Sequence, residues 1–306
     1  MSDTINIACA ADNNYVQHTG VMLTSLFENN KNNAIHIHLF SADFNEENKS
    51  AIEKTVNSYN QKFSFYQLDE NAFKGCYISH HVSYATYYRI VIPQTINQKI
   101  NKLLYLDTDI IVCKDLKELW LMAFESNVIC AAKEPSFNEF ERLNIPHEKN
   151  YFNAGILLIN VNEWLKQQLT PKVFSFINEY QNKLTFWDQD ALNANLYNHW
   201  KTLPPKWNQQ AAIFELPRKK LIEVYGEKEL DEAINDPCII HYTGSSKPWD
   251  YLNLHPYKKE YFKYLEKTIW KNYRFPNITF TKRVQKLLMR IMGVQRFQKM
   301  VSLLSS

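Results

Sequence analysis

Asp107 and Asp109 have the types and spacing that point most directly to chemistry in this sequence. They interrupt an apolar run over 102–112, so an extended backbone presents both carboxylates on one face and Thr108 on the other. Two adjacent buried carboxylates repel each other and lose their charge unless a cation lies between them. A divalent metal held by few protein ligands meets this need and keeps positions open for phosphate oxygens. The alternative is a strand that ends in two solvated acids, because Asp-x-Asp is short and common.

A second pair of acids, Asp188 and Asp190, flanks Gln189 at the start of an expected helix over 191–197. In one interpretation both acids serve the helix N-terminus, where Asp188 caps free amides and Asp190 complements the dipole. In the other, they accept hydrogen bonds from the hydroxyl groups of a sugar. The sequence by itself leaves both interpretations open.

His241 follows a short apolar run, 238–240, and begins a loop that carries Gly244 and Lys247. An imidazole, an accessible backbone amide and an ammonium group can serve as a metal ligand, an amide donor and a phosphate cation. A lone histidine after a strand is usually structural, so the functional interpretation depends on what lies beside it.

Arg89 and Asn153 are two further candidates. Arg89 lies near the end of an expected helix over 83–92, which Pro93 is expected to end. It is either an ion-pair residue or a clamp for pyrophosphate or carboxylate groups, because its guanidinium is a planar fork. Asn153 precedes Gly155 at the start of an expected strand, where small residues allow a ligand to approach the backbone closely.

The elements that must position these groups alternate between strands and helices. Apolar or alternating runs predict strands, and helical spacing predicts helices, in the order strand 4–11, helix 19–30, strand 34–40, helix 45–59 and strand 62–68. This alternation is typical of an α/β fold with a Rossmann-like, mainly parallel sheet flanked by helices. Ligands bind at the carboxyl ends of such strands, so Asp12, Asn14 and Tyr15 are expected on the same rim as Asp107 and Asp109.

Composition indicates a globular protein with room for one or two domains: 306 residues, 45% of them hydrophobic. Five scattered cysteines without a Cys-x-x-Cys pair suggest reduced core residues in a cytosolic protein. The N-terminus lacks the pattern of a signal peptide, and the sequence contains no apolar run of about 18 residues. We therefore expect a cytoplasmic protein.

The end of the chain is strongly basic. Residues 271–306 contain eight lysines and arginines and no acid, so a net charge of +3 leaves 3 − 8 = −5 for residues 1–270. Residues 281–304 have the pattern of a basic amphipathic helix, which is suited to an anionic membrane surface. The alternative is a helix packed on the rest of the protein.

Taken together, five segments resemble the retaining glycosyltransferases of family 8, of the bacterial lipopolysaccharide galactosyl- and glucosyltransferase type. In chain order they read Ala-Ala-Asp-Asn-Asn-Tyr, Tyr-Leu-Asp-Thr-Asp, Phe-Asn-Ala-Gly-Ile-Leu-Leu-Ile-Asn, Asp-Gln-Asp-Ala-Leu-Asn and His-Tyr-Thr-Gly-Ser-Ser-Lys-Pro-Trp. Each is weak alone, but five in this order are specific. The resemblance covers roughly residues 4–270.

The resemblance implies a GT-A fold over residues 1–270. The basic pattern that follows predicts a membrane-association segment over 271–306. The resemblance also implies a UDP-hexose donor, with galactose or glucose as the sugar, held by Mn2+ or by Mg2+. The implied donor and cofactor residues are metal ligands Asp107, Asp109 and His241; uridine contacts Ala10, Asp12, Asn14 and Tyr15; diphosphate contacts Gly244 and Lys247; sugar contacts Arg89, Asn153, Asp188 and Gln189; and Thr108 between the two acids.

For catalysis, the resemblance places Gln189 beneath the anomeric carbon, with Asp188 binding sugar hydroxyls. Retention by double displacement needs a nucleophile at that place, and an amide oxygen is a poor one. We therefore favour substitution on the same face of the sugar, in which the departing phosphate helps to deprotonate the acceptor. Asp190 is the reserve nucleophile.

The implied acceptor is a saccharide of lipopolysaccharide or lipooligosaccharide on a lipid-linked glycan, with Glu134 touching it. The enzyme would then be attached peripherally to the inner face of the cytoplasmic membrane. One alternative is a phosphatase or phosphotransferase of the haloacid dehalogenase type that uses Asp107. A second is a nucleic-acid-binding protein that uses the basic tail, although this leaves the acidic body and the Asp-Gln-Asp segment unexplained.

Overall fold

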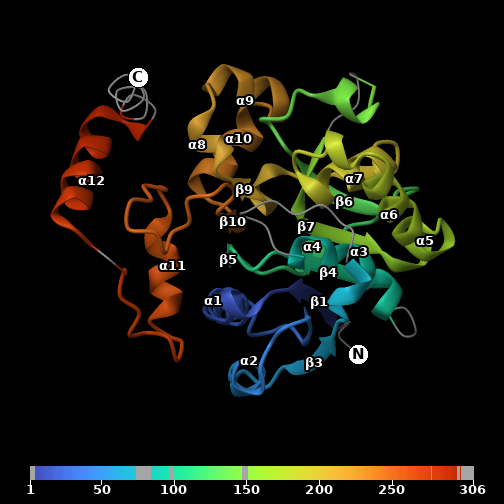
Figure 1. Cartoon of the computed structure of the whole chain (residues 1–306), viewed down its shortest axis with the longest axis horizontal. Coiled ribbons are helices and arrows are strands. Elements are labelled where there is room, and N and C mark those ends of the chain that lie inside the picture. Colours follow the sequence, from blue (N-terminus) through green and yellow to red (C-terminus); the bar gives the residue numbers. More distant parts are fainter. Residues whose placement is uncertain are drawn as a thin grey trace.

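The first three strands form one parallel half of a seven-stranded sheet (Figure 1). A computed structural model describes residues 4–73, 84–96, 100–146, 151–276, 278–294 and 297. The strands β1 (Ile5–Ala10), β2 (Ile35–Ser41) and β3 (Lys62–Gln67) are joined by the helices α1 (Val16–Asn29) and α2 (Glu46–Ser58). The predicted alternation is confirmed here, with boundaries that differ by a few residues.

The other half of the sheet mixes both strand directions. Its strands are β4 (Lys102–Leu106), β7 (Phe152–Asn160), β6 (Ile129–Lys133) and β8 (Trp200–Thr202). The full order is β3-β2-β1-β4-β7-β6-β8, and β7 runs antiparallel to both neighbours while the other four adjacent pairs are parallel. The expected mainly parallel sheet is confirmed.

Successive residues of β1 enter two different hydrophobic cores. Ile7 and Cys9 pack on one face with α1 and α2, whereas Ala8 and Ala10 pack on the other. The second face is covered by α3 (Ala85–Ile96), α5 (Val161–Lys166), α6 (Leu169–Glu179) and α7 (Trp187–Leu196). A sheet buried on both faces explains why its strands are almost continuously apolar.

The predicted end of a helix at Pro93 is wrong, because Pro93 lies inside α3. A proline in a helix removes the bond to the carbonyl four residues earlier, that of Arg89. Tyr87, Ile90 and Ile92 before the proline are fully buried and Ile96 after it is buried, so packing of this helix outweighs the lost bond. The extra length of α3 continues past Arg89 and keeps that residue within a packed helix.

A small second sheet joins distant parts of the chain. Its order is β5-β10-β9, formed by β5 (Ile110–Val112), β10 (Ile239–His241) and β9 (Gln209–Gln210). In the register, His241 pairs with Ile110 on one side and with Gln210 on the other. The backbone therefore brings His241 beside the Asp-Thr-Asp segment.

Several shorter elements complete the described chain. They are the 3-10 helices η1 (Asn13–Tyr15), η2 (Glu70–Phe73), η3 (Phe140–Leu143), η4 (Gln181–Lys183) and η5 (Pro205–Trp207), and the helices α4 (Lys117–Trp120), α8 (Ala212–Glu215), α9 (Arg218–Tyr225), α10 (Glu227–Asn235), α11 (Lys258–Leu265) and α12 (Phe280–Met292). Among the described residues, no helix is long and apolar enough to cross a membrane.

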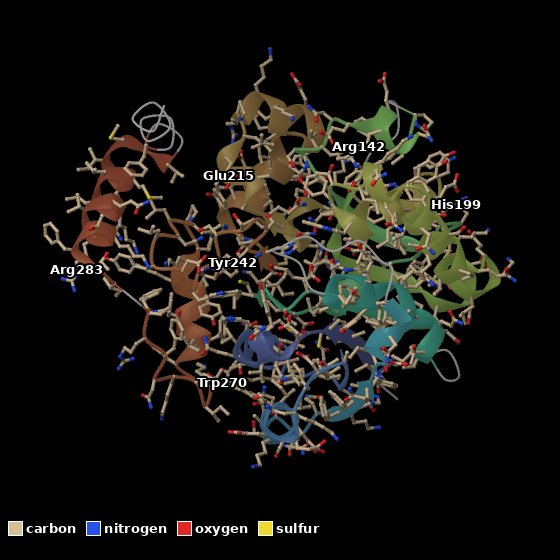
Figure 2. The ribbon with its side chains drawn as sticks, viewed as in Figure 1. Arg142, His199, Glu215, Tyr242, Trp270 and Arg283 are labelled. Carbon is tan, nitrogen blue, oxygen red and sulfur yellow. The ribbon has the colours of Figure 1, made fainter. Side chains whose placement is uncertain are left out.

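A close contact between Gly20 and Trp270 joins the region after α11 to the body of the protein. A Cβ atom at Gly20 in α1 would lie 2.2 Å from the ring of Trp270, so the missing side chain leaves space for the indole. Trp270 lies at the foot of the C-terminal region, and Arg283 on α12 lies at the outer edge of the molecule (Figure 2). The predicted boundary at residue 270 stays a prediction, as does the role of 271–306, of which 277, 295, 296 and 298–306 lie outside the described residues.

Candidate functional site

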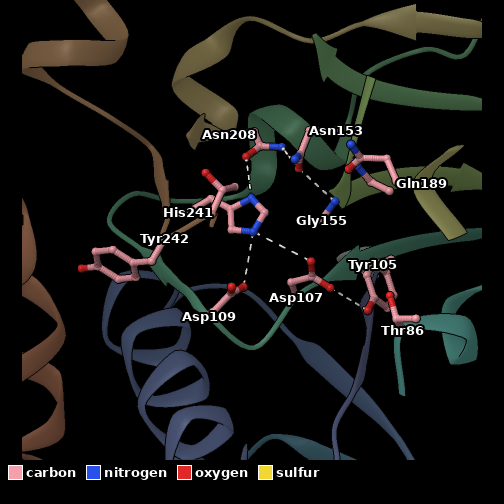
Figure 3. Close-up of polar contacts among 12 residues, drawn as sticks. Thr86, Tyr105, Asp107, Asp109, Asn153, Gly155, Gln189, Asn208, His241 and Tyr242 are labelled. Carbon is pink, nitrogen blue, oxygen red and sulfur yellow. Dashed lines mark hydrogen bonds and ion pairs between the residues drawn. The ribbon is translucent and has the colours of Figure 1, made fainter. Parts of the chain in front are cut away.

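Asp107, Asp109 and His241 converge on one point (Figure 3). The two acids lie in the turn between β4 and β5, and the histidine ends β10. One ligand atom from each of the three lies within 4.8 Å of the others. His241 Nε2 is 3.3 Å from Asp109 Oδ1 and 3.8 Å from Asp107 Oδ2. Two carboxylates and one imidazole in this arrangement form a donor set suited to a divalent cation.

Gly155 of β7 provides the space in which these groups meet. A Cβ atom there would lie 2.2 Å from His241 Cε1 and 2.7 Å from Asp107 Oδ2. Its carbonyl also accepts a hydrogen bond of 2.8 Å from the backbone N–H of Asp107. From the sequence, the small residues here are expected to let a ligand approach the backbone. In the structure, Gly155 makes room for the protein's own side chains, those of His241 and Asp107.

Two cations balance the two acids. Lys247 Nζ lies 2.6 Å from Asp109 Oδ2, and Arg89 Nη2 lies 3.1 Å from Asp107 Oδ1. Burial alone would raise the pKa of Asp109, but Lys247 and His241 outweigh it and hold that pKa well below its usual range. Tyr105 donates a further hydrogen bond of 2.8 Å to Asp107 Oδ1. Asp109 is therefore ionised, and both carboxylates are held in a fixed orientation.

Arg89 also connects this point to Asp188. Its Nε lies 2.7 Å from Asp188 Oδ2, while Thr86 donates to Asp188 Oδ1 at 2.6 Å. Asp188 is only 3% exposed, and this burial raises its pKa to about 6, although Arg89 and Thr86 act in the opposite direction. The interpretation of Asp188 as a helix cap is wrong, because its carboxylate faces α3.

A cavity of about 410 Å³ lies against these residues. It brings together nine of the predicted site residues and Glu134, with several others: Thr86, Arg89, Asp107, Asp109, Glu134, Ser136, Asn153, Gly155, Phe186, Trp187, Asp188, Gln189, Ala211, Ala212, Glu215, Leu216, His241, Thr243, Gly244 and Lys247. Gly244, which lines the cavity, has φ of +83°, a conformation that favours glycine. The predicted acids, amides and cations thus surround one space.

Gln189 and Asn153 face the cavity from opposite segments. Gln189 Oε1 accepts a hydrogen bond of 2.9 Å from the backbone N–H of Ala154. Asn153 Nδ2 donates to Glu134 Oε2 at 3.2 Å. Because the oxygen of Gln189 is already engaged, it is a still poorer nucleophile than a free amide.

The structure does not bring Asp190 to the cavity among the residues it describes. Its carboxylate is fully buried, lies 2.8 Å from Arg142 Nη1 and accepts hydrogen bonds from Tyr151 and from the backbone of Thr185 and Phe186. These partners use its oxygens within the fold, so the structure gives no support to Asp190 as a reserve nucleophile.

The predicted uridine contacts lie beyond the described lining of this cavity. Ala10 ends β1, and Asp12 Oδ1 accepts from the backbone N–H of Asn14 at 3.0 Å. Burial raises the pKa of Tyr15, and Asp109, Asp12 and Asp107 add to that rise, so this side chain lies in the field of both acids of the site. Thr108 is 7% exposed between them. The roles of these residues stay predictions.

Sequence reasoning missed two residues next to the predicted ones. Asn208 Oδ1 lies 2.9 Å from His241 Nδ1, and the Trp249 ring lies 5.9 Å edge-on from that of Tyr15. Asn208 follows a Pro-Pro-Lys-Trp turn and has no signature of its own, so no local signal identifies it. Trp249 belongs to the quoted His-to-Trp segment but was given no role.

Solved structures of similar shape establish the class of fold. The galactosyltransferase LgtC in complex with donor and acceptor sugar analogs matches with a TM-score of 0.78 at 21% identity, over 92% of this chain and 99% of that one. The Q189E active-site mutant of LgtC matches equally well, with a TM-score of 0.78 at 20% identity. The chain therefore has a GT-A fold, as predicted.

Sequence comparison establishes the family. The model of glycosyl transferase family 8 matches residues 6–253, and the chain belongs to that family. General stress protein A of Bacillus subtilis is 34% identical, over 90% of this chain and 98% of that protein. A lipopolysaccharide 1,2-glucosyltransferase of Escherichia coli is 31% identical, over 93% of this chain and 83% of that protein. The resemblance seen in the five motifs is confirmed, and the phosphatase alternative is not favoured.

Proposed function

We propose that this chain is a metal-dependent, retaining hexosyltransferase that moves galactose or glucose from a UDP-sugar to a saccharide acceptor of lipopolysaccharide or lipooligosaccharide. The convergence of Asp107, Asp109 and His241 at the edge of the cavity carries the proposal, since residues 132 positions apart in the chain meet at one point (241 − 109 = 132). Relatives named as lipopolysaccharide glucosyl- and galactosyltransferases support the choice of sugar and acceptor.

The donor set fits a metal such as Mn2+, with Mg2+ as the second choice. Two carboxylates and one imidazole are hard and borderline ligands, and Gly155 keeps the space between them free of any side chain. Arg89 and Lys247 pair with the carboxylates and hold them in place. A bound divalent cation would supply Lewis-acid stabilisation of the charge that grows on a departing diphosphate.

The chain's own residues provide the rest of the proposed chemistry. Lys247 and the backbone amide of Gly244 face the cavity and would hold the diphosphate oxygens as their charge increases. Asp188 would accept hydrogen bonds from hydroxyls of the donor sugar. With the Gln189 oxygen engaged by Ala154, we favour same-face substitution, in which the leaving phosphate takes the proton of the acceptor hydroxyl.

Glu134 and Phe186 line the cavity, and we propose that they contact the acceptor.

The proposal of membrane attachment comes from the surface of α12. On α12, the exposed apolar residues are Phe280, Val284, Leu287 and Ile291, and lysines and arginines share the same helix. We propose that α12 attaches the enzyme to the anionic inner face of the cytoplasmic membrane.

The test is hydrolysis and transfer assays with a panel of UDP-sugars, with and without Mn2+. Turnover with UDP-galactose or UDP-glucose that requires the metal and retains the anomeric configuration is the expected result. Phosphomonoester hydrolysis without a nucleotide sugar would support the phosphatase alternative instead. Pelleting with vesicles that contain or lack anionic lipid, using the full chain and a Leu287→Lys variant, tests the membrane proposal separately.

A further inference from the structure

We propose that Asn208 is a positioning residue that selects the tautomer of His241, through a chain of hydrogen bonds that begins at the Gly155 backbone amide. This inference rests on the proposed metal site. It concerns which nitrogen of the imidazole carries the proton, and therefore whether the other nitrogen can bind a cation at all.

At the start of this chain of hydrogen bonds, it is fixed which group donates and which group accepts. The backbone N–H of Gly155 donates to Asn153 Oδ1 at 3.0 Å. Because a backbone N–H can only donate, the atom that faces it must be the amide oxygen of Asn153. Asn208 Nδ2 donates to this same oxygen at 3.0 Å, so the orientation of the Asn208 amide follows from that of Asn153.

The polarity then reaches the histidine ring (Figure 3). Asn208 Oδ1 faces His241 Nδ1 at 2.9 Å, and two acceptors cannot share a hydrogen bond, so Nδ1 carries the proton. The lone pair is left on Nε2, which faces Asp109 at 3.3 Å and Asp107 at 3.8 Å. This tautomer is the one that a metal ligand bound through Nε2 requires.

The competing tautomer would be attractive without such a chain. With the proton on Nε2, the ring would donate a hydrogen bond to Asp109. Nε2 would then have no lone pair with which to bind a cation. Asn208 prevents this because its oxygen needs a donor. Burial makes the requirement strict: Asn208 is 0% exposed and His241 is 3% exposed, so water does not readily replace either partner.

The backbone holds both ends of the interaction in place. Asn208 directly precedes β9, whose Gln210 pairs with His241 in the parallel register of the small sheet. At the other end, Asn153 Nδ2 donates to Glu134, which lines the cavity. A reoriented amide at either asparagine would therefore change whether Nε2 of His241 carries the proton.

The first experiment measures Mn2+ affinity, by electron paramagnetic resonance of the free ion. The Asn208→Leu variant removes the acceptor but keeps the number and branching of the side-chain heavy atoms, and it is expected to weaken binding by about 10- to 100-fold. Gln209→Leu is the matched control: Gln209 is equally buried and donates to Ala233 O at 2.6 Å, so its loss should leave Mn2+ affinity unchanged. Asn208→Asp keeps an acceptor for Nδ1 and should lie closer to wild type than Asn208→Leu.

The second experiment reads the tautomer in the metal-free protein. Nitrogen-15 spectra of histidine-labelled protein at about pH 8, with His241 assigned through His241→Gln, are expected to show the proton on Nδ1. In Asn208→Leu the proton should move toward Nε2. A wild-type ring protonated on Nε2, or equal Mn2+ affinity in Asn208→Leu and Gln209→Leu, would overturn the proposal.

The two readouts separate this inference from the proposed function. If wild-type protein does not bind Mn2+, the metal assignment fails while the wild-type spectrum still decides the tautomer. If Asn208→Leu does not fold, the spectrum of the wild type alone decides the matter.

Discussion

The protein contains two Asp-x-Asp sequences with the same spacing and opposite outcomes. Asp107 and Asp109 lie in the turn between β4 and β5, and both carboxylates reach the same point beside His241. Asp188 and Asp190 lie in α7, where two residues correspond to a rotation of about 200°, so their side chains leave opposite sides of the helix. Asp188 faces the cavity, and Asp190 is buried against Arg142.

The contrast shows that the spacing of two acids does not by itself decide whether they act at the same site. The backbone conformation that carries them decides it. In the first pair, like charges are held together and compensated by Arg89 and Lys247. In the second, Asp188 shares Arg89 with Asp107, whereas Asp190 pairs with Arg142 on the other side of the helix. The following predictions test whether the two pairs differ in this way.

The largest effect is expected for Asp109→Asn. Removing one carboxylate of the convergent pair should lower donor turnover by at least about 10²-fold, because charge stabilisation at the leaving group is lost. The measurement is UDP-sugar hydrolysis at saturating Mn2+, with circular dichroism as the check on folding. Turnover near that of wild type would contradict the assignment of Asp109 as a metal ligand.

Gly155→Ala should disturb the same metal site by steric overlap, without removing any of its polar groups. The added methyl would lie 2.2 Å from His241 Cε1, so the ring has to move away from the two acids. We expect a clear loss of Mn2+ affinity together with a destabilisation of about 1–3 kcal/mol. Gly20→Ala is the control, since its clash is with Trp270 and should lower stability without affecting Mn2+ binding.

Asp190→Asn should act on stability. It leaves Arg142 without its buried counter-ion, which we expect to cost about 3 kcal/mol in the free energy of unfolding. Turnover of the folded fraction should remain. For Asp188→Asn we expect the reverse: a small change in the denaturant midpoint and a large fall in turnover. A severe loss of turnover per folded molecule in Asp190→Asn would contradict its structural role.

The smallest effect concerns pH. Burial raises the pKa of Asp188 to about 6, so its carboxylate becomes protonated as the pH falls through that value. If the ionised form binds donor hydroxyls, turnover should decline below about pH 6 and recover above it. Asp188→Asn should remove this acidic limb from its residual activity. A wild-type profile that is flat from pH 5 to 8 would show that ionisation of Asp188 does not matter.

Much of the site was predictable because it depends on local backbone and on motif order. The two acids are one residue apart between two apolar runs, so the sequence alone predicts that both carboxylates leave the chain on the same side. The alternation of strands and helices predicts a rim where strand ends meet, and the five ordered motifs identify His241, Gly244 and Lys247 as partners of these acids. Both predictions use periodicity and order, which a sequence carries explicitly.

Other features were decided only by tertiary packing. Pro93 continues a helix because its neighbours are buried, and Asp190 points away from the cavity because it pairs with Arg142. The roles of Gly155 and Asn208 depend on which side chains lie within a few ångströms of them, from strands far apart in the chain. A sequence records the type of each residue, whereas the distances that turn these types into a hydrogen-bond chain or a space for a cation exist only once the sheets have formed.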